Sequence, residues 1–337
     1  MRTIQFGLIL AASLAAISAT AHHAEIGRYD PNDQGTIEGE ITDVFWRNPH
    51  VRLLLSRTGE DGQEEEWEIE FGSVNTVVRL GVSRDLLAVG DRVSVHGSMG
   101  RNGVAAMFAT GIILPDGREV ALQAETDQRY NITENAQEEA DSADASLRAD
   151  IFRVWVPVTF RNRLSMEGGS GYPLTEAGRA IQAQWDPEED PALLCIPPGM
   201  PTVMANPYPV SFEDRDGAIV MRLEEWDGER IIYVDGDGEP SQPRMGRSVG
   251  RWEGNTLFVE TRDIDWRYVD DIGTPQSEDV VINERFILSE DGTDLAWEAE
   301  VVDPVNFTEP VPMEVRWTWI QGQQVMPFNC ELPADRQ

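Results

Sequence analysis

The sequence predicts an all-β protein that folds as two successive β-barrels. Two observations support this class: short runs of alternating apolar and polar residues recur along the chain, and turn signals such as Asp-Gly and Gly-Asn separate them. A third observation is length, because 337 residues exceed the ~250–300 at which one hydrophobic core usually stops growing. We therefore expect two domains, each with its own core.

Residues 1–21 have the pattern of a secretory signal peptide. An apolar stretch from Phe6 to Ile17 follows a basic start, and Ala19-Thr20-Ala21 is a small-residue cleavage site. We therefore expect the mature chain to begin at His22 and to be periplasmic or secreted. No later apolar run approaches the ~20 residues that cross a bilayer, so insertion into a membrane is not expected.

Residues 22–122 carry the pattern of a small five-stranded barrel. The expected elements, in order, are the strands Ile37–Trp46, Val51–Leu55 and Trp67–Phe71, the helical turns Ser73–Leu80 and Ser83–Leu87, and the strands Arg92–Gly97 and Val104–Leu114. Three strands, a short helix and two strands is the order of a barrel of the oligonucleotide/oligosaccharide-binding (OB) type. The fold type alone assigns no ligand.

An acidic linker over residues 123–150 leads to the second domain, residues 151–337. The linker is rich in Glu, Asp, Ala, Gln and Asn, a composition typical of a solvated segment. A strand at Ile151–Val158 and a helix at Thr175–Gln184 come first, and roughly seven or eight antiparallel strands follow from Val210 onward. Such a meander removes its exposed edges by closing, so we expect a calycin-like antiparallel β-barrel whose interior holds side chains or one small ligand.

Cys195 and Cys330 are the only cysteines. In an exported chain an even pair favours a disulfide, which here would join the start of the second domain to its end and stabilise the fold by ~4 kcal/mol. A catalytic cysteine is the alternative, but no histidine follows His96 to act as its base in the same domain.

The chain is strongly acidic. It has 60 acidic residues against 27 basic ones, and its formal net charge is -33. Such a surface repels phosphate backbones, so nucleic acid is not an expected partner. Every basic residue is arginine, which excludes Schiff-base and lysine general-base chemistry.

All four histidines lie in the first third of the chain, at His22, His23, His50 and His96. The terminal amine and imidazole of His22, joined by His23 or His50, form a nitrogen set that suits copper(II) or zinc, with copper favoured by intrinsic affinity. We therefore predict a copper or zinc site made by His22, His23 and His50. The alternative is a polar N-terminus with two solvated histidines, and His96 is expected to be an ordinary surface or hydrogen-bonded residue.

The second domain offers carboxylates and arginines for acid/base chemistry. Glu284 and Arg285 are adjacent in a strand-like run, so their side chains face opposite sides of the sheet and one of them points into the barrel. A buried arginine would need a carboxylate partner, for which Glu260 on a neighbouring strand is the candidate. Glu260, Glu284 and Arg285 are therefore the candidate catalytic groups, and a structural core pair is the alternative.

The motifs resemble those of an uncharacterised family of secreted bacterial two-domain proteins. The matching stretches include His22-His23, Trp46–His50, Gly90–Gly97, Cys195–Pro201 and Gly246–Leu257. Similar proteins often carry Asp-Gly-Arg-x-His-Pro in their second part, where this chain has Asp235–Pro240 without arginine or histidine. The resemblance covers most of the mature length and implies no activity.

We expect an exported binding protein with a copper or zinc site at its mature N-terminus and a small-molecule pocket in the second barrel. The alternative is an exported enzyme that acts on a small apolar or carbohydrate substrate inside that barrel, with carboxylates and arginine as its catalytic groups. A purely structural or interaction module is the third interpretation. A partly polar cavity around Glu260, Glu284 and Arg285 would favour the enzyme, and a filled interior with clustered histidines would favour metal binding.

Overall fold

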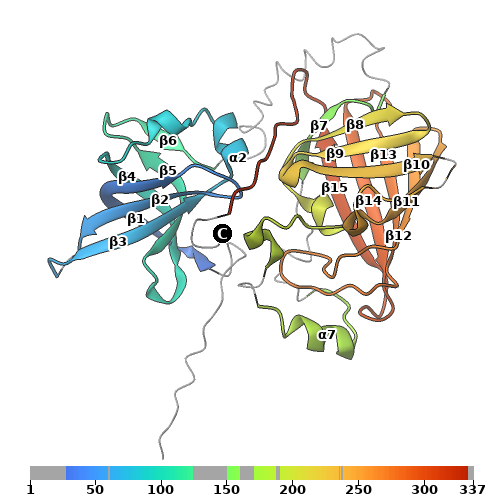
Figure 1. Cartoon of the computed structure of the whole chain (residues 1–337), viewed down its shortest axis with the longest axis horizontal. Helices are drawn as coiled ribbons and strands as arrows, with labels where there is room; N and C mark the ends of the chain where they lie inside the picture. Colours follow the sequence, from blue (N-terminus) through green and yellow to red (C-terminus); the bar gives the residue numbers. More distant parts are fainter. Residues whose placement is uncertain are drawn as a thin grey trace, which may run out of the picture.

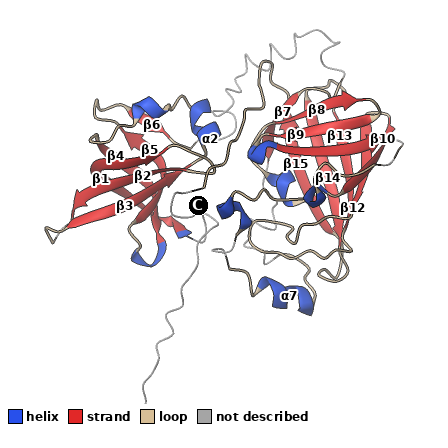
Figure 2. Cartoon of the chain, in the orientation of Figure 1, coloured by secondary structure: helices blue, strands red, loops and turns tan. Residues whose placement is uncertain are grey.

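The computed structural model describes residues 28–59, 61–123, 150–159, 171–186, 190–234, 236 and 238–332. The fold is mostly β, with a sheet in the N-terminal third and a barrel in the rest (Figure 1, Figure 2). The expected signal peptide, His22, His23 and nearly all of the expected linker lie outside the described residues. Among the residues that the structure describes, no helix is long and apolar enough to cross a membrane.

The N-terminal sheet has the strand order β3-β2-β1-β4-β5-β6, and every neighbouring pair in it is antiparallel. Its strands are β1 (Tyr29–Phe45), β2 (Val51–Thr58), β3 (Glu64–Phe71), β4 (Arg92–Gly100), β5 (Ala106–Ile113) and β6 (Glu119–Ala121). A parallel pairing of β3 with β5 closes the strands from β3 to β5 into a ring. Alternate apolar residues make the core, among them Ile41, Leu53, Leu55, Ile69, Val95 and Ile112.

This six-strand sheet corrects the expectation of a five-stranded barrel. The sequence pattern predicts that Val104–Leu114 is the last strand of this domain. In the structure Gly117 N donates to Leu114 O at 2.9 Å, so the chain turns back and a further strand, β6, pairs with β5. β6 is three residues long and has no buried residue, so its pairing depends on the edge that β5 offers rather than on its own pattern. The result is a ring of strands with one strand added, and not a barrel.

The expected helical turns lie between β3 and β4. Helix α2 spans Val74–Arg79, and the Ser73 side chain accepts a hydrogen bond from Thr76 N at 3.0 Å, so the predicted serine cap is confirmed. A 3₁₀ turn follows at Arg84–Leu86.

The rest of the chain forms a closed barrel in the order β10-β11-β12-β13-β14-β15-β7-β8-β9. Its strands are β7 (Val154–Thr159), β8 (Val210–Arg215), β9 (Ala218–Leu223), β10 (Gly228–Val234), β11 (Arg247–Glu253), β12 (Thr256–Arg262), β13 (Val281–Leu288), β14 (Asp294–Val302) and β15 (Val311–Thr318). β8 to β15 follow one another from Val210, as expected. β7 is the strand expected near Ile151–Val158, and it joins β15 to β8 as the ninth strand of the barrel.

One strand pair departs from the expected antiparallel meander, because β10 and β11 are parallel. Two parallel neighbours cannot be joined by a tight hairpin, since the chain has to return to the starting end of the first strand. The chain between Val234 and Arg247 makes this return and includes a 3₁₀ turn at Pro243–Met245. The barrel is therefore mixed rather than antiparallel.

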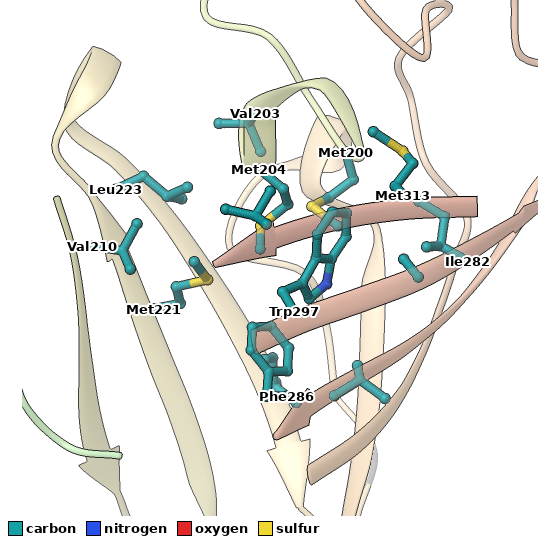
Figure 3. Close-up of a cluster of buried hydrophobic side chains, with 14 of the residues drawn as sticks. Met200, Val203, Met204, Val210, Met221, Leu223, Ile282, Phe286, Trp297 and Met313 are labelled. Atoms are coloured by element: carbon teal, nitrogen blue, oxygen red, sulfur yellow. The ribbon is translucent and has the colours of Figure 1, made fainter. Parts of the chain in front are cut away.

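Large apolar side chains pack inside the barrel, among them Trp155, Trp297, Trp317 and Phe286. The 3₁₀ turn Thr202–Ala205 lies outside the strands and covers one end of this cluster. Figure 3 shows Trp297 at the centre, with Met200 and Met204 on one side and Phe286 on the other.

Helix α7 (Glu176–Gln182) lies outside the barrel (Figure 1). The Thr175 side chain accepts a hydrogen bond from Gly178 N at 3.0 Å, which confirms the predicted start of this helix.

A disulfide joins Cys195 to Cys330, which confirms the predicted pair. Past β15 the chain leaves the barrel and runs to the N-terminal sheet (Figure 1), where Cys330 forms an isolated β-bridge with Asn48. Glu331 N donates to Asn48 O at 3.2 Å. The disulfide was expected to join the two ends of one domain, and it also secures a segment that contacts the other.

Candidate functional site

His50 lies at the entry of β2, directly after the cis peptide bond Asn48–Pro49. Its Nδ1 contacts Oε1 of Glu70, which stands near the end of the neighbouring strand β3. The other oxygen of Glu70, Oε2, accepts a hydrogen bond from the Tyr29 hydroxyl at 2.8 Å and pairs with Arg28 Nη1 at 3.3 Å. Both oxygens of the carboxylate are therefore engaged, and one of them holds the imidazole.

These neighbours keep Glu70 in its charged form. Burial alone would raise the pKa of the Glu70 carboxyl, but the charge and hydrogen bond of His50, helped by Tyr29 and Arg28, lower that pKa to about 2. Burial and the nearby charge of Glu70 raise the pKa of Tyr29 well above its usual value, so the phenol keeps its proton and donates it. At neutral pH the site is a carboxylate held between proton donors.

Glu70 also determines which atom of His50 can meet a ligand. A carboxylate only accepts hydrogen bonds, so Nδ1 of His50 carries a proton, and Nε2 is the ring atom that would coordinate a metal. The His50 side chain is 38% exposed, and its ring meets that of Phe108 edge-on with centroids 6.3 Å apart. Metal-binding histidines usually donate their second ring N–H to a carboxylate or carbonyl in this way.

Glu225, in the barrel part of the chain, has a carboxyl whose pKa is shifted. It lies in the 3₁₀ turn Glu225–Asp227 between β9 and β10, and the residue is partly buried. Burial raises the pKa of this carboxyl to about 8, the charge of His50 opposes the rise, and Asp271 and Glu224 add to it. Among the described residues, none donates a hydrogen bond to the Glu225 side chain.

A buried polar network connects the N-terminal sheet to the barrel. The Glu224 side chain is fully buried and accepts hydrogen bonds from Arg79 Nη2 at 2.6 Å and from Asn75 Nδ2 at 3.1 Å. Asn75 Oδ1 in turn accepts from Asn48 Nδ2 at 3.0 Å. These contacts tie the entry of β2 to the turn that carries Glu225.

Inside the barrel, the candidate catalytic group Glu284 pairs with Arg230 of β10. Arg230 Nη1 and Nη2 donate to its two oxygens at 2.8 and 2.6 Å, and both side chains are fully buried. Thr261 and Trp297 donate to the same carboxylate at 2.6 and 2.8 Å, and Ser248 accepts from Arg230 Nε at 3.1 Å. A charged pair with all of its atoms satisfied by protein groups is typical of a structural core pair.

The other two candidate catalytic groups lie on the outer face of the barrel. Arg285 pairs with Glu298 at 2.6 Å, and Glu260 pairs with Arg262 at 2.6 Å. One member of the adjacent pair at 284 and 285 points inward, as expected, and it is Glu284. The structure brings neither the Glu260 nor the Arg285 side chain to Glu284. The expectation that Glu260 pairs with a buried arginine is therefore wrong: the buried arginine is Arg230, and it pairs with Glu284.

Sequence reasoning missed the roles of Glu70 and Arg230. Arg230 and the buried Ile232 are two residues apart in β10, so their side chains face the same side of the strand. This spacing indicates, from the sequence alone, that Arg230 points inward. Glu70 stands in an alternating run beside buried Ile69 and Phe71, a pattern that predicts a solvent-facing side chain. No local signal marks its contact with the histidine.

Of the three predicted metal ligands, the structure describes only His50, since His22 and His23 lie outside the described residues. Within the described ranges, no group of three or more His, Cys, Asp or Glu residues could hold a metal ion by itself. The His96 side chain is 40% exposed, and its Nε2 lies 3.8 Å from Glu119 Oε1, as in an ordinary surface pair.

Asp190 should make the stability of the fold depend on pH. It caps the 3₁₀ turn before Cys195, where its Oδ1 accepts from Ala192 N at 2.9 Å. Burial raises the pKa of this carboxyl from 3.8 to about 6, although the hydrogen bond from Ala192 opposes the rise. The folded state therefore holds the proton more tightly than the unfolded state does. The resulting stability is present below about pH 4 and is lost as the pH rises to about 6.

Asp190→Asn should remove this pH-dependent loss while keeping an oxygen for Ala192 N. Relative to the wild type, the variant should gain up to about 2 kcal/mol of unfolding free energy between pH 4 and pH 7. Urea unfolding of both proteins at the two pH values measures the difference. A difference that is the same at both pH values would contradict the assignment.

One protein-family model matches the N-terminal part of the chain. Residues 10–109 match DUF6152, a family of unknown function. No curated protein matches the chain. The matched stretch holds His22, His23 and His50, so the resemblance noted in the sequence is confirmed for this part, and the motifs from Cys195 onward lie beyond it.

Proposed function

We propose that this protein is an exported metal-binding protein in which His50 coordinates copper(II) or zinc together with His22 and His23. The observation that supports this most is the contact of His50 Nδ1 with the Glu70 carboxylate. A partner of this kind sets the tautomer and orientation of a metal-binding imidazole and raises its basicity. Burying a carboxylate is unfavourable unless it is paired, so its placement under a half-exposed histidine favours a role for that histidine.

The chemistry of the ligand set favours copper(II) or zinc. Imidazole nitrogens suit both ions, and copper(II) binds a given nitrogen set more tightly. Cleavage of the signal peptide before His22 would add the terminal amine as a further nitrogen ligand. The proposed location is the periplasm or the exterior of the cell, and neither nucleic acid nor membrane insertion forms part of the proposal.

The strand order supports a finer fold assignment for the N-terminal sheet. The ring β3-β2-β1-β4-β5, with α2 between β3 and β4, has the connectivity of an OB-type fold, which we propose for it. The barrel is similar to a calycin-like meander except at β10 and β11. A ligand pocket or an active site inside the barrel has less support, because Arg230 and Glu284 bond to each other.

The proposal predicts one-to-one binding of copper(II) and zinc by protein that begins at His22. His50→Ala should lower the affinity, whereas His96→Ala, the same change on the surface, should leave it unchanged. Glu70→Gln should weaken binding by about 10–100-fold, because it keeps the shape of the side chain and removes its charge. Isothermal titration calorimetry of the mature protein and the variants measures these affinities.

Two outcomes would overturn the proposal: no binding by the mature protein, or equal affinity in the wild type and His50→Ala. A version with one residue added before His22 tests the terminal amine separately. Weaker binding by that version would show that the amine is a ligand.

A further inference from the structure

We propose that the C-terminal segment, residues 324–332, is a peptide ligand that two copies of this chain exchange when the Cys195–Cys330 bond is reduced. Each copy then holds the segment of the other, and the two form a dimer. The inference does not depend on the proposed metal site. Three features of the molecule support it: side chains of both parts hold the segment, they hold it mainly through its main chain, and one disulfide secures it.

Side chains of the N-terminal sheet bind the carbonyl groups of the segment, which runs from the barrel to that sheet (Figure 1). The donor atoms lie in helix α2 and in the stretch before β2. The contacts are Arg79 Nη2 to Gln324 O at 3.3 Å, Asn75 Nδ2 to Pro327 O at 3.3 Å, Arg47 Nη1 to Leu332 O at 3.3 Å, and Asn48 Nδ2 to Phe328 O.

Carboxylates of the barrel bind the N–H groups of the same segment. Met326 N donates to Glu224 Oε2 at 2.8 Å. Phe328 N and Asn329 N donate to the two oxygens of Asp227 at 2.9 and 3.1 Å. The segment is therefore held by its carbonyl groups from one part and by its N–H groups from the other. Main-chain hydrogen bonds of this kind are how proteins bind extended peptides with little dependence on sequence.

Phe328 is the one side chain of residues 324–332 that is buried. Its ring packs against those of Trp226 and Tyr208, with centroids 5.1 and 5.6 Å apart. Recognition therefore needs an extended main chain and one aromatic ring. The C-terminal segment of a second copy meets both needs, because its sequence is identical, so a second copy is the partner that the contacts fit.

The segment can leave its place without breaking any pair of barrel strands. It follows β15 and belongs to none of the nine strands of the barrel, and it joins the N-terminal sheet through the isolated bridge of Cys330 with Asn48. Gln321 and Gly322 just before it are exposed, and Gly322 has a φ of 85°, a conformation that favours glycine. We expect the chain to pivot at this exposed pair.

The disulfide prevents such exchange in the oxidised protein. A dithiol reductant transfers two electrons and two protons to the Cys195–Cys330 bond, which becomes two thiols, while the dithiol becomes a disulfide. The tethered segment still competes at an effective concentration of about 1 mM, so exchange requires a similar protein concentration. The formal charge of -33 on each copy opposes association, and salt should weaken that repulsion.

The oligomeric state of the wild type tests the inference without any variant. Size-exclusion chromatography with light scattering is run at about 1 mM protein and about 0.5 M salt, with and without dithiothreitol. We expect the oxidised protein to be a monomer and the reduced protein to form a dimer whose share rises with concentration. A reduced protein that stays monomeric would overturn the inference. The same dimer in the oxidised protein would also overturn it, because the copies would then associate elsewhere.

A trapped heterodimer tests whether the segment itself is exchanged. The donor, Cys195→Ser, keeps Cys330 in its segment, and the acceptor, Cys330→Ser, keeps Cys195. When the two are mixed with glutathione disulfide, which takes up the two electrons and the two protons, a Cys195–Cys330 bond can form only between copies. The bonded heterodimer is measured on a non-reducing gel, and mass spectrometry identifies the bond.

Placing Phe328→Ala in one partner or in the other gives a matched pair of mixtures. In the acceptor, the substitution weakens its own segment and should favour entry of the donor segment. In the donor, it should have the opposite effect. We expect at least about tenfold more heterodimer from the first mixture, because a buried aromatic anchor contributes much of the affinity. Equal yields would show random collision of thiols and overturn the inference, as would the absence of heterodimer from both mixtures.

Discussion

Arg230→Met should lower the free energy of unfolding by about 3–5 kcal/mol. The substitution leaves the Glu284 carboxylate inside the barrel without its cation, although Thr261 and Trp297 still donate to it. Methionine keeps much of the length of arginine, so the loss reports charge and hydrogen bonding more than an empty space. Urea unfolding followed by tryptophan fluorescence measures it, with the midpoint and the slope both recorded.

Arg285→Met is the matched control on the outer face of the same barrel. Arg285 also pairs with a carboxylate, Glu298, but its side chain is 54% exposed, so the loss should stay below about 1 kcal/mol. The double substitution Arg230→Met/Glu284→Leu should recover most of the stability that Arg230→Met loses, because apolar side chains of similar volume can replace a buried ion pair. Equal losses from Arg230→Met and Arg285→Met would contradict a core role for Arg230.

Replacing Cys195 and Cys330 with serine should lower the free energy of unfolding by about 4 kcal/mol. The two cysteines are 135 residues apart in the sequence, so their bond removes many conformations of the unfolded chain. The bond also holds the C-terminal segment against Asn48, and those contacts should weaken with it. Guanidinium unfolding of the oxidised wild type and of the double variant measures the loss.

Reduced wild-type protein is the control for the serine side chains. It lacks the bond but keeps both sulfur atoms, so it should unfold at the same denaturant concentration as the double variant. A double variant as stable as the oxidised wild type would show that the disulfide contributes nothing to the stability of the fold.

Local patterns predicted many of the elements. Ser73 and Thr175 cap the helices that they were expected to start, because a cap acts within one turn. Glu284 and Arg285 face opposite sides of β13, because side chains alternate along any strand. The strands from Val210 onward follow one another as the turn signals indicated.

Pairing between distant segments was harder to predict. β6 forms on the edge of β5, and β11 lies parallel to β10, although nothing in either strand's own sequence requires that partner. The contact between His50 and Glu70 depends on the register in which β2 pairs with β3. Register is a property of two strands together, so a pattern within one strand does not reveal it.

The amino-acid order alone leads to the mostly β class, to the Cys195–Cys330 bond and to the prediction that one of Glu284 and Arg285 points inward. Composition or alternation over a few residues is enough for each of these conclusions. Packing in three dimensions selects Arg230 as the partner of Glu284, and it brings Glu70 to His50. Arg230 and Glu284 are 54 residues apart in the sequence, and they meet because the barrel closes around them. Contacts of this kind follow from strand register and barrel closure, which no local pattern encodes.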